Sequence, residues 1–181
     1  MISFVFTRRA FLAGIALLLA GLLPAAAQQH ETTRRAEIRV RSPKVAEALD
    51  SYRLIARSEN GAYTPLGAQW SDRLPDLIAQ RAVDSLSAAG LHAFGEGGPA
   101  TANYDLMLEV DAFDYDAGEQ RVEIAIAAKV VALTSGRTLA RQEFAATEPV
   151  PSGDPTLVAA ALAKTFSGVM ADVASFVADK V

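Results

Sequence analysis

The chain has 181 residues, of which 51% are hydrophobic and 21% are charged, and this composition suits one globular domain rather than a disordered chain. Its formal net charge of −4 makes it a poor candidate for binding nucleic acid or an anionic membrane surface. Cysteine is absent from the sequence, which excludes disulfides, thiol catalysis and thiolate metal sites.

Residues 1–27 have the three parts of an export signal. Arg8 and Arg9 form the positively charged start, and residues 11–23 form an apolar stretch that is too short for an ordinary membrane-spanning helix. The order of residues 7–12 resembles a twin-arginine signal, because a threonine precedes the arginine pair and a Phe-Leu pair follows it after one alanine. An ordinary secretory signal that carries two arginines is the alternative, and both routes lead to the bacterial periplasm.

The end of this segment has the small residues that a signal peptidase reads. Ala25 and Ala27 occupy those positions, which predicts cleavage before Gln28 and a mature protein that is soluble in the periplasm. A signal that stays uncleaved and tethers the chain is the alternative. Residues 28–35 are polar and predict a flexible lead-in, so that residues 36–181 are expected to form a single domain.

The first elements of this domain are predicted to be short strands. Residues 37–41 alternate between polar and apolar side chains, as a half-buried strand does. Residues 52–57 and 62–68 predict a hairpin, because Asn60-Gly61 supplies the positive φ angles of a tight turn. A proline and a glycine make the second arm of this hairpin irregular.

A helix is predicted over residues 72–89. Pro75 falls in its first turn, where a missing N–H costs little, and Gly90 suits the position after its last turn. Residues 91–94 then predict a short strand, and residues 95–102 predict a flexible loop. The apolar residues of the helix recur at helical spacing and form one stripe: Leu74, Leu77, Ile78, Ala82, Leu86 and Ala89.

Three consecutive strands are predicted next, over residues 104–113, 121–133 and 138–145. Apolar and polar or small side chains alternate along them, which predicts an antiparallel meander with one buried face and one face in water. The turns between them are predicted at residues 114–119 and 134–137, and a glycine in the second turn tolerates a positive φ angle.

The chain closes with a second predicted helix. Residues 148–153 predict a linker, Asp154-Pro155 suits a helix start, and the helix runs to about residue 179. Together the elements predict an α+β fold, a two-layer sandwich in which a mainly antiparallel sheet carries two helices packed on one face.

No residue pattern predicts catalysis, a cofactor or a metal site. The two histidines, His30 and His92, have no second ligand or partner pattern beside them. Residues 114–119 resemble the start of a calcium loop, but the position that needs a bidentate glutamate holds Ala125, which favours a solvated turn. Residues 95–98 are glycine-rich but follow a predicted helix, whereas a phosphate-binding loop precedes one.

Two further features have a simple structural interpretation. Trp70, the only tryptophan, is expected to pack under the first turn of the first helix, and an anchor for a partner protein is the alternative. Four acidic residues are expected to be solvated on the outer face of the sheet, since paired carboxylates act as catalysts only in perturbed surroundings: Asp105, Glu109, Asp111 and Glu123.

The order of several stretches resembles that of one protein family. A strand segment at residues 52–54 precedes Trp70, a three-residue spacer, Leu74-Pro75 and an amphipathic helix. Downstream stretches that fit the same pattern are residues 104–110 with Phe113, residues 136–140 with Phe144, and the last helix. This order resembles the ABC-type transport auxiliary lipoprotein family, which includes the PqiC-like proteins, and the resemblance covers residues 36–181.

The resemblance implies a non-catalytic periplasmic accessory of an ABC transporter, often one with MCE-type proteins that move phospholipid between membranes. The implied partners are an ABC permease or ATPase or an MCE-type substrate-binding protein, with phospholipid as a further candidate ligand and no nucleic acid. Tyr63, Trp70, Leu74 and Pro75 are the candidate partner or family-motif residues. Family members usually carry a lipobox cysteine, which this chain lacks, so a soluble copy or one held by its partners is expected.

Two other classes of function stay open. A lipid- or small-ligand-binding module requires a concave apolar pocket, expected between the sheet and the helices. An envelope enzyme requires a cleft with converging titratable groups, which the sequence does not display.

Overall fold

The computed structural model describes residues 36–181, and the export signal and lead-in predicted for residues 1–35 lie outside the described residues. Within the described part, an eight-stranded mixed sheet and two α-helices confirm the predicted α+β class. In chain order the elements are β1 (Glu37–Val40), β2 (Lys44–Val45), a 3-10 turn (Glu47–Leu49), β3 (Arg53–Arg57), β4 (Tyr63–Gln69), α1 (Leu74–Ala88), β5 (His92–Phe94), β6 (Tyr104–Asp116), β7 (Arg121–Ala132), β8 (Arg137–Pro149) and α2 (Pro155–Ala178).

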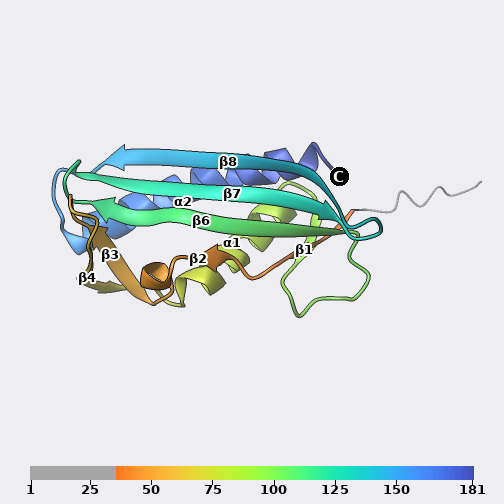
Figure 1. The fold of residues 1–181 in the computed structure, drawn as a ribbon, viewed down its shortest axis with the longest axis horizontal. Helices are drawn as coiled ribbons and strands as arrows, with labels where there is room; N and C mark the ends of the chain where they lie inside the picture. Colours follow the sequence, from red (N-terminus) through yellow and green to blue (C-terminus); the bar gives the residue numbers. More distant parts are fainter. Residues whose placement is uncertain (1–35) are drawn as a thin grey trace, which may run out of the picture. The chain divides into compact units, whose positions relative to one another are not determined.

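β6 lies in the middle of the sheet and pairs along both of its edges (Figure 1). On one side, β6, β7 and β8 form the predicted antiparallel meander. On the other side, three short strands run parallel to successive parts of β6: β1 pairs at Tyr104, β2 at Glu109 and β3 at Tyr115. The sequence pattern does not predict these parallel pairs, because strands joined by long crossovers leave no local turn signal.

β6 is longer than predicted. The alternation of side chains predicts that this strand ends at residue 113 and that a turn follows, whereas β6 continues to Asp116. A bulge explains the difference, because Asp111 is an extra residue of β6 with no partner in register on β7. The bulge shifts the alternation of side chains, so that Phe113 lies on the buried face and Asp114 lies on the outer face.

Other boundaries differ from the prediction by a few residues. β8 runs to Pro149 rather than ending at residue 145, which shortens the predicted linker. α1 begins at Leu74 rather than at residue 72. The β3–β4 hairpin is confirmed, and Gly61 in its turn has a φ angle of +80°. α2 begins after Asp154 as predicted, and the Asp154 carboxylate accepts hydrogen bonds from two backbone N–H groups of the first turn.

Both helices pack on one face of the sheet, as predicted (Figure 1). Aromatic side chains form the contact between the two layers. The ring of Phe113 on β6 meets the ring of Phe166 on α2 edge-to-face, with 5.1 Å between centroids. Phe144 on β8 and Phe176 on α2 meet in the same way at 5.7 Å. Edge-to-face pairs of this kind add to the free energy gained from burying the rings.

α2 carries much of the core. Its length and a mean hydropathy of 1.5 would allow a helix to cross a membrane, and no other helix of residues 36–181 meets that test. The apolar residues of α2 are explained by the core, since the stripe of the helix that faces the sheet is buried. Val158, Leu162, Met170 and Val177 each have a relative exposure of 0%.

Candidate functional site

The outer face of the sheet, opposite the helices, holds paired charges beside some of the solvated carboxylates predicted for it. Asp105 on β6 is buried, with 9% exposure, which corrects the prediction for this residue. Arg39 on β1 donates two hydrogen bonds to the Asp105 carboxylate, at 2.8 and 3.1 Å. Glu109 and Asp111 are exposed as predicted. The pairing arises because parallel β1 brings Arg39 into register with Asp105.

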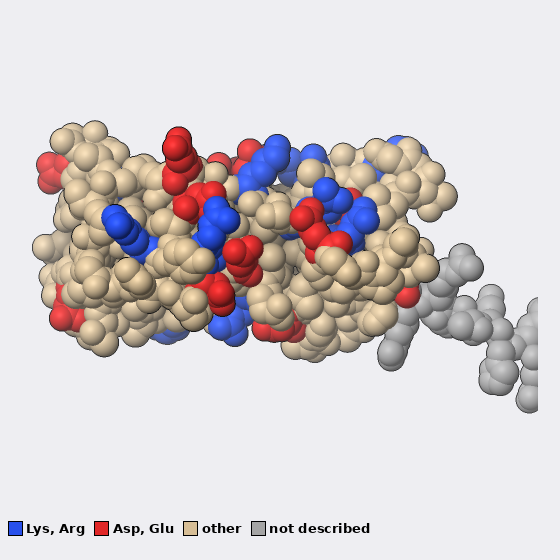
Figure 2. Space-filling view, turned by 90° about the horizontal axis from the view of Figure 1, so that it is seen from below, with Lys and Arg blue, Asp and Glu red and all other residues tan. Residues whose placement is uncertain are grey.

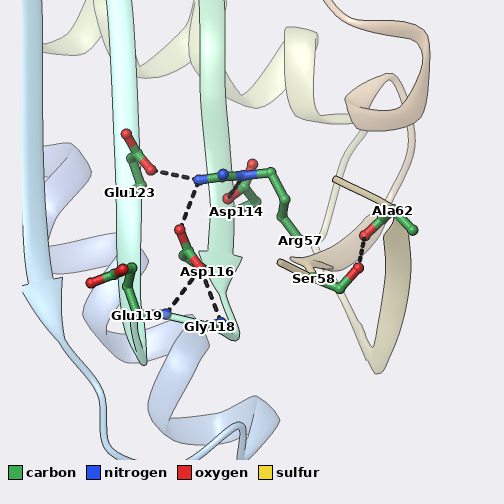
Figure 3. A network of polar contacts seen from close by, with 8 residues as sticks. All are labelled: Arg57, Ser58, Ala62, Asp114, Asp116, Gly118, Glu119 and Glu123. Carbon is green, nitrogen blue, oxygen red and sulfur yellow. Dashed lines mark hydrogen bonds and ion pairs between the residues drawn. The ribbon is translucent and has the colours of Figure 1, made fainter. Parts of the chain in front are cut away.

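A second group of charges gathers around Arg57 at the end of β3 (Figure 3). Its guanidinium lies 3.3 Å from a carboxylate oxygen of Asp114, 3.2 Å from Asp116 and 2.6 Å from Glu123. Asp114 and Asp116 belong to β6 and Glu123 belongs to β7, so the Arg57 cluster, as we call these four residues, connects three strands. One cation therefore faces three carboxylates.

The surroundings of the two aspartates in the Arg57 cluster shift their pKa values in opposite directions. Burial raises the pKa of Asp114, against the attraction of Arg57, and its side chain has no exposed surface. One carboxylate oxygen of Asp114, Oδ2, is buried without a hydrogen-bond partner. The pKa of Asp116 is lowered instead, because its carboxylate accepts hydrogen bonds from the backbone N–H groups of Glu119 and Gly118 at 3.1 and 3.0 Å.

These contacts give the Arg57 cluster a structural role. Asp116 closes the β6–β7 turn, and Arg57 fastens β3 to the end of the meander, where only two pairs of residues join β3 to β6. Within residues 36–181, no three His, Cys, Asp or Glu side chains are placed to hold a metal ion. No local sequence pattern indicates this cluster, since the partners of Arg57 lie 57 to 66 residues further along the chain.

A hollow of about 280 Å³ lies on the outer face of the sheet, which we call the outer hollow. Its apolar floor includes Met107 on β6 and Ala127 on β7. Ala127 has 3% exposure even though no helix covers this face. The charged residues of the rim are Arg41, Lys44, Glu96, Glu109, Lys129 and Arg141.

The rim of the outer hollow has more cations than anions. Arg41 is paired with Glu96 at 3.0 Å, and Arg141 is paired with Glu143 at 2.8 Å. No carboxylate of residues 36–181 forms an ion pair with Lys44 or Lys129. Glu109 on the rim also forms no ion pair within residues 36–181, so the rim presents two free ammonium groups and one free carboxylate above an apolar floor. This balance attracts a small anion with an apolar part.

The candidate family-motif residues do not form one cluster. Leu74 has 2% exposure and Pro75 is buried at the start of α1. The ring of Trp70 packs edge-to-face on Phe113, with 5.9 Å between centroids. Tyr63, at the other end of β4, is 38% exposed. The signal and cleavage residues Arg8, Arg9, Ala25, Ala27 and Gln28 lie outside the described residues.

The surface seen from the side of β1 and β2 does not separate its charges by sign. Lys and Arg side chains lie among Asp and Glu side chains across the middle of this face (Figure 2). A nucleic-acid-binding surface concentrates positive charge instead. This face lacks that concentration of positive charge.

The fold is shared with solved proteins. Protein XCC0632 from Xanthomonas campestris, assigned to the family DUF330, is 25% identical, with a TM-score of 0.67 over 76% of this chain and 80% of that one. An uncharacterized protein is 15% identical, with a TM-score of 0.65 over 78% and 91%. The hypothetical protein CT253 from Chlamydia trachomatis is 7% identical, with a TM-score of 0.50 over 80% and 99%, and the latter two show the fold alone.

A search of curated protein sequences finds no match. A comparison with protein families matches residues 19–174 to the family described as "ABC-type transport auxiliary lipoprotein component". The match includes the Trp70–Pro75 segment, the meander and most of α2, and it confirms the resemblance seen in the sequence. This is a family of transport auxiliaries rather than of enzymes. The chain therefore belongs to the ABC-type transport auxiliary lipoprotein component family.

Proposed function

We propose that the protein is a non-catalytic periplasmic component of an ABC-type transport system that moves phospholipid between membranes with an MCE-type protein. The observation that carries the proposal is the family match over residues 19–174. We propose that the protein acts by contact with the ABC permease, the ATPase or the MCE-type substrate-binding protein. The charged groups of the outer face support a non-catalytic role, because Arg39 and Arg57 hold carboxylates in ion pairs that stabilise the sheet.

Exposed aromatic residues near the family motif are the best candidates for the contact. Tyr63 is 38% exposed on β4, the strand at one end of the sheet order. Tyrosine is enriched in interface hot spots, since it buries a large ring at a small entropic cost. Trp70, Leu74 and Pro75 would act indirectly by positioning β4 and α1.

Affinity capture from cell envelopes tests this proposal. The tagged full chain should retain an ABC permease, its ATPase or an MCE-type protein under mild detergent conditions. Replacing Tyr63 with alanine should weaken capture about tenfold without lowering the unfolding temperature. Leu133, which is 36% exposed in the turn between β7 and β8 and lies outside the Trp70 segment, provides the matched control as Leu133→Ala. Recovery of no transporter or MCE component with the unaltered chain would contradict the proposed function.

We also propose that residues 1–27 direct export and are removed before Gln28. Replacing Arg8 and Arg9 with lysine should stop export if the twin-arginine route is used, whereas a general secretory signal tolerates lysine because it requires only positive charge. Cell fractionation and N-terminal sequencing of the periplasmic protein read out the route and the cleavage site. A mature chain that still begins upstream of Gln28 would favour a tether.

The outer hollow favours a second candidate function, binding of a small amphiphilic anion such as a phospholipid headgroup. Lys44 and Lys129 would hold the anion and Met107 would contact its apolar part. Calorimetric titration with short-chain phosphatidylglycerol tests this, with Lys129→Glu expected to weaken binding about tenfold. Arg81→Glu on the exposed side of α1 is the matched control. Equal affinities for the two variants, or no binding by the unaltered protein, would exclude this site.

A further inference from the structure

β8 is a long strand with one free edge. Within residues 36–181 it pairs with β7 alone, and it forms the upper border of the sheet in Figure 1. Its 13 residues include a run from Arg137 to Glu143 in which every residue except Ala140 is exposed. The backbone N–H and C=O groups along such an edge can pair with a strand of another chain.

Two side chains of opposite charge flank Gln142 in the middle of β8. Arg141 and Glu143 flank it, and they lie on the outer face of the sheet because their partners on β7 are Lys129 and Ala127. The side chains of Arg141 and Glu143 are 50% and 68% exposed. A strand that reads cation, amide, anion is complementary to its own antiparallel copy.

We propose that the protein forms a twofold dimer in which β8 pairs antiparallel with β8 of a second copy, with Gln142 on the axis. In this register Arg141 of each copy lies opposite Glu143 of the other. The exposed ion pair that these residues form within one copy, at 2.8 Å, is thereby exchanged for two ion pairs across the interface. The two Gln142 side chains lie opposite each other on the helix side, where each amide offers both a donor and an acceptor. The inference does not depend on the proposed transport function.

Electrostatics select this register over its neighbours. A slip must preserve which side chains face outward, since a shift that breaks the period of two would move every side chain to the other face. Of the two nearest permitted slips, one places Arg141 opposite its own copy and the other places Glu143 opposite its own copy. Like charges directly opposite destabilise a strand pair, so both slips are disfavoured.

The ends of β8 fit the same register. A bulge makes Leu139 the extra residue of β8 against β7, and the alternation is regular from Ala140 to Pro149. In the proposed register, the regular stretches of the two copies overlap from Ala140 to Phe144. Pro149, which has no N–H to donate, lies opposite residue 135, beyond the end of the second β8. A groove of about 330 Å³ beside Phe144 and Phe176 borders the same edge and leaves room for the second copy's side chains.

Charge exchange tests the proposal in a way that misfolding cannot imitate. Protein purified from the envelope of cells that express the full chain is studied by sedimentation equilibrium. Arg141→Glu alone and Glu143→Arg alone should each weaken the dimer about tenfold, because each places like charges opposite each other. A mixture of these two variants should dimerise again, since every pair across the interface is then complementary. Arg137→Glu, on the same strand, should have little effect.

A crosslink tests the position of the axis. The chain has no cysteine, so Gln142→Cys introduces a single thiol. Two such thiols would face each other across the axis and should form an intermolecular disulfide on mild oxidation. In the control Thr138→Cys, the two thiols would lie eight residues apart along the strands, about 26 Å, and should stay reduced.

Three results would overturn the proposal. One is a protein that stays monomeric at the highest concentration reached in sedimentation. Another is a dimer that resists both single charge changes. The last is a dimer in which Thr138→Cys crosslinks as readily as Gln142→Cys. Thermal unfolding of each variant serves as the folding control, because all five positions are exposed.

Discussion

Asp114 and Asp116 lie on the outer face of β6, and the fold has opposite effects on their negative charges. Asp114 is fully buried and has one carboxylate oxygen without a hydrogen bond, so the folded protein disfavours its charge. Asp116 receives two backbone hydrogen bonds from the β6–β7 turn, so the folded protein favours its charge. Both share Arg57 as a cation. The two residues should therefore affect the pH dependence of stability with opposite signs.

Replacing Asp114 with asparagine should stabilise the protein at neutral pH. The raised pKa means that the folded state binds the proton more tightly than the unfolded chain does, so the charge destabilises the fold above that pKa. The advantage of the variant should shrink as the pH falls through the raised pKa towards the ordinary aspartate value. Urea unfolding at several pH values measures this, and a variant that is less stable at pH 7 would show that the Arg57 ion pair outweighs burial.

Replacing Asp116 with alanine should destabilise the protein by about 1–2 kcal/mol at neutral pH, because two backbone N–H groups lose their acceptor. The lowered pKa of Asp116 places its contribution above the ordinary aspartate pKa, and the contribution is lost as the pH falls through the lowered value. The difference between variant and parent in the same urea experiments should therefore vanish in strong acid. A pH-independent difference would mean that the charge of Asp116 is not what stabilises the turn.

At the scale of the elements, Trp70 connects the β3–β4 hairpin to the two layers. Its ring contacts Phe113, which in turn contacts Phe166 of α2. Replacing Trp70 with alanine should cost about 3 kcal/mol, in the range for large aromatic residues at a core. Trp70→Phe should retain much of the stability. If envelope partners bind Trp70 directly, Trp70→Phe would lose capture at near-normal stability, so the two measurements separate packing from partner contact.

The sequence predicts most elements but not the bulge in β6. Period-two alternation identifies the meander, and the helical stripes identify α1 and α2, because those signals are local. The extra residue at Asp111 leaves the alternation readable only up to Val110, and Asp114 then resembles the start of a turn. The burial of Asp105 and Asp114 depends on Arg39 and Arg57 from distant strands, and no local pattern announces such partners.

At the scale of the whole described domain, one half of the sheet is paired over long strands and the other half consists of short strands. β6 and β7 pair along almost their full lengths, whereas β2 has two residues and β5 has three. Hydrogen exchange followed by mass spectrometry should find the slowest amides in the centres of β6 and β7 and the fastest strand amides in β2 and β5. Uniform protection across all strands would contradict this division.

The sequence can indicate only those parts of the candidate site whose residues are contiguous in the chain. The family motif around Trp70 and Pro75 is contiguous, so it is readable and it led to the family that the comparison confirms. The outer hollow brings together side chains from the segment after β1, from β2 and from β6 to β8. Such a surface exists only after the sheet has formed, and this is why composition and spacing alone do not reveal it.

The three parallel strands beside β6 have a consequence for the order in which the chain folds. Synthesis delivers β1, β2 and β3 long before β6, and the contact between Arg39 and Asp105 closes a loop of 66 residues. Closing such loops is slow, because chain entropy is lost before any contact is gained. The meander can form from neighbouring hairpins, so we expect it to provide the template onto which the earlier strands dock. On this expectation the native sheet is completed backwards along the chain, from its C-terminal half to its N-terminal half.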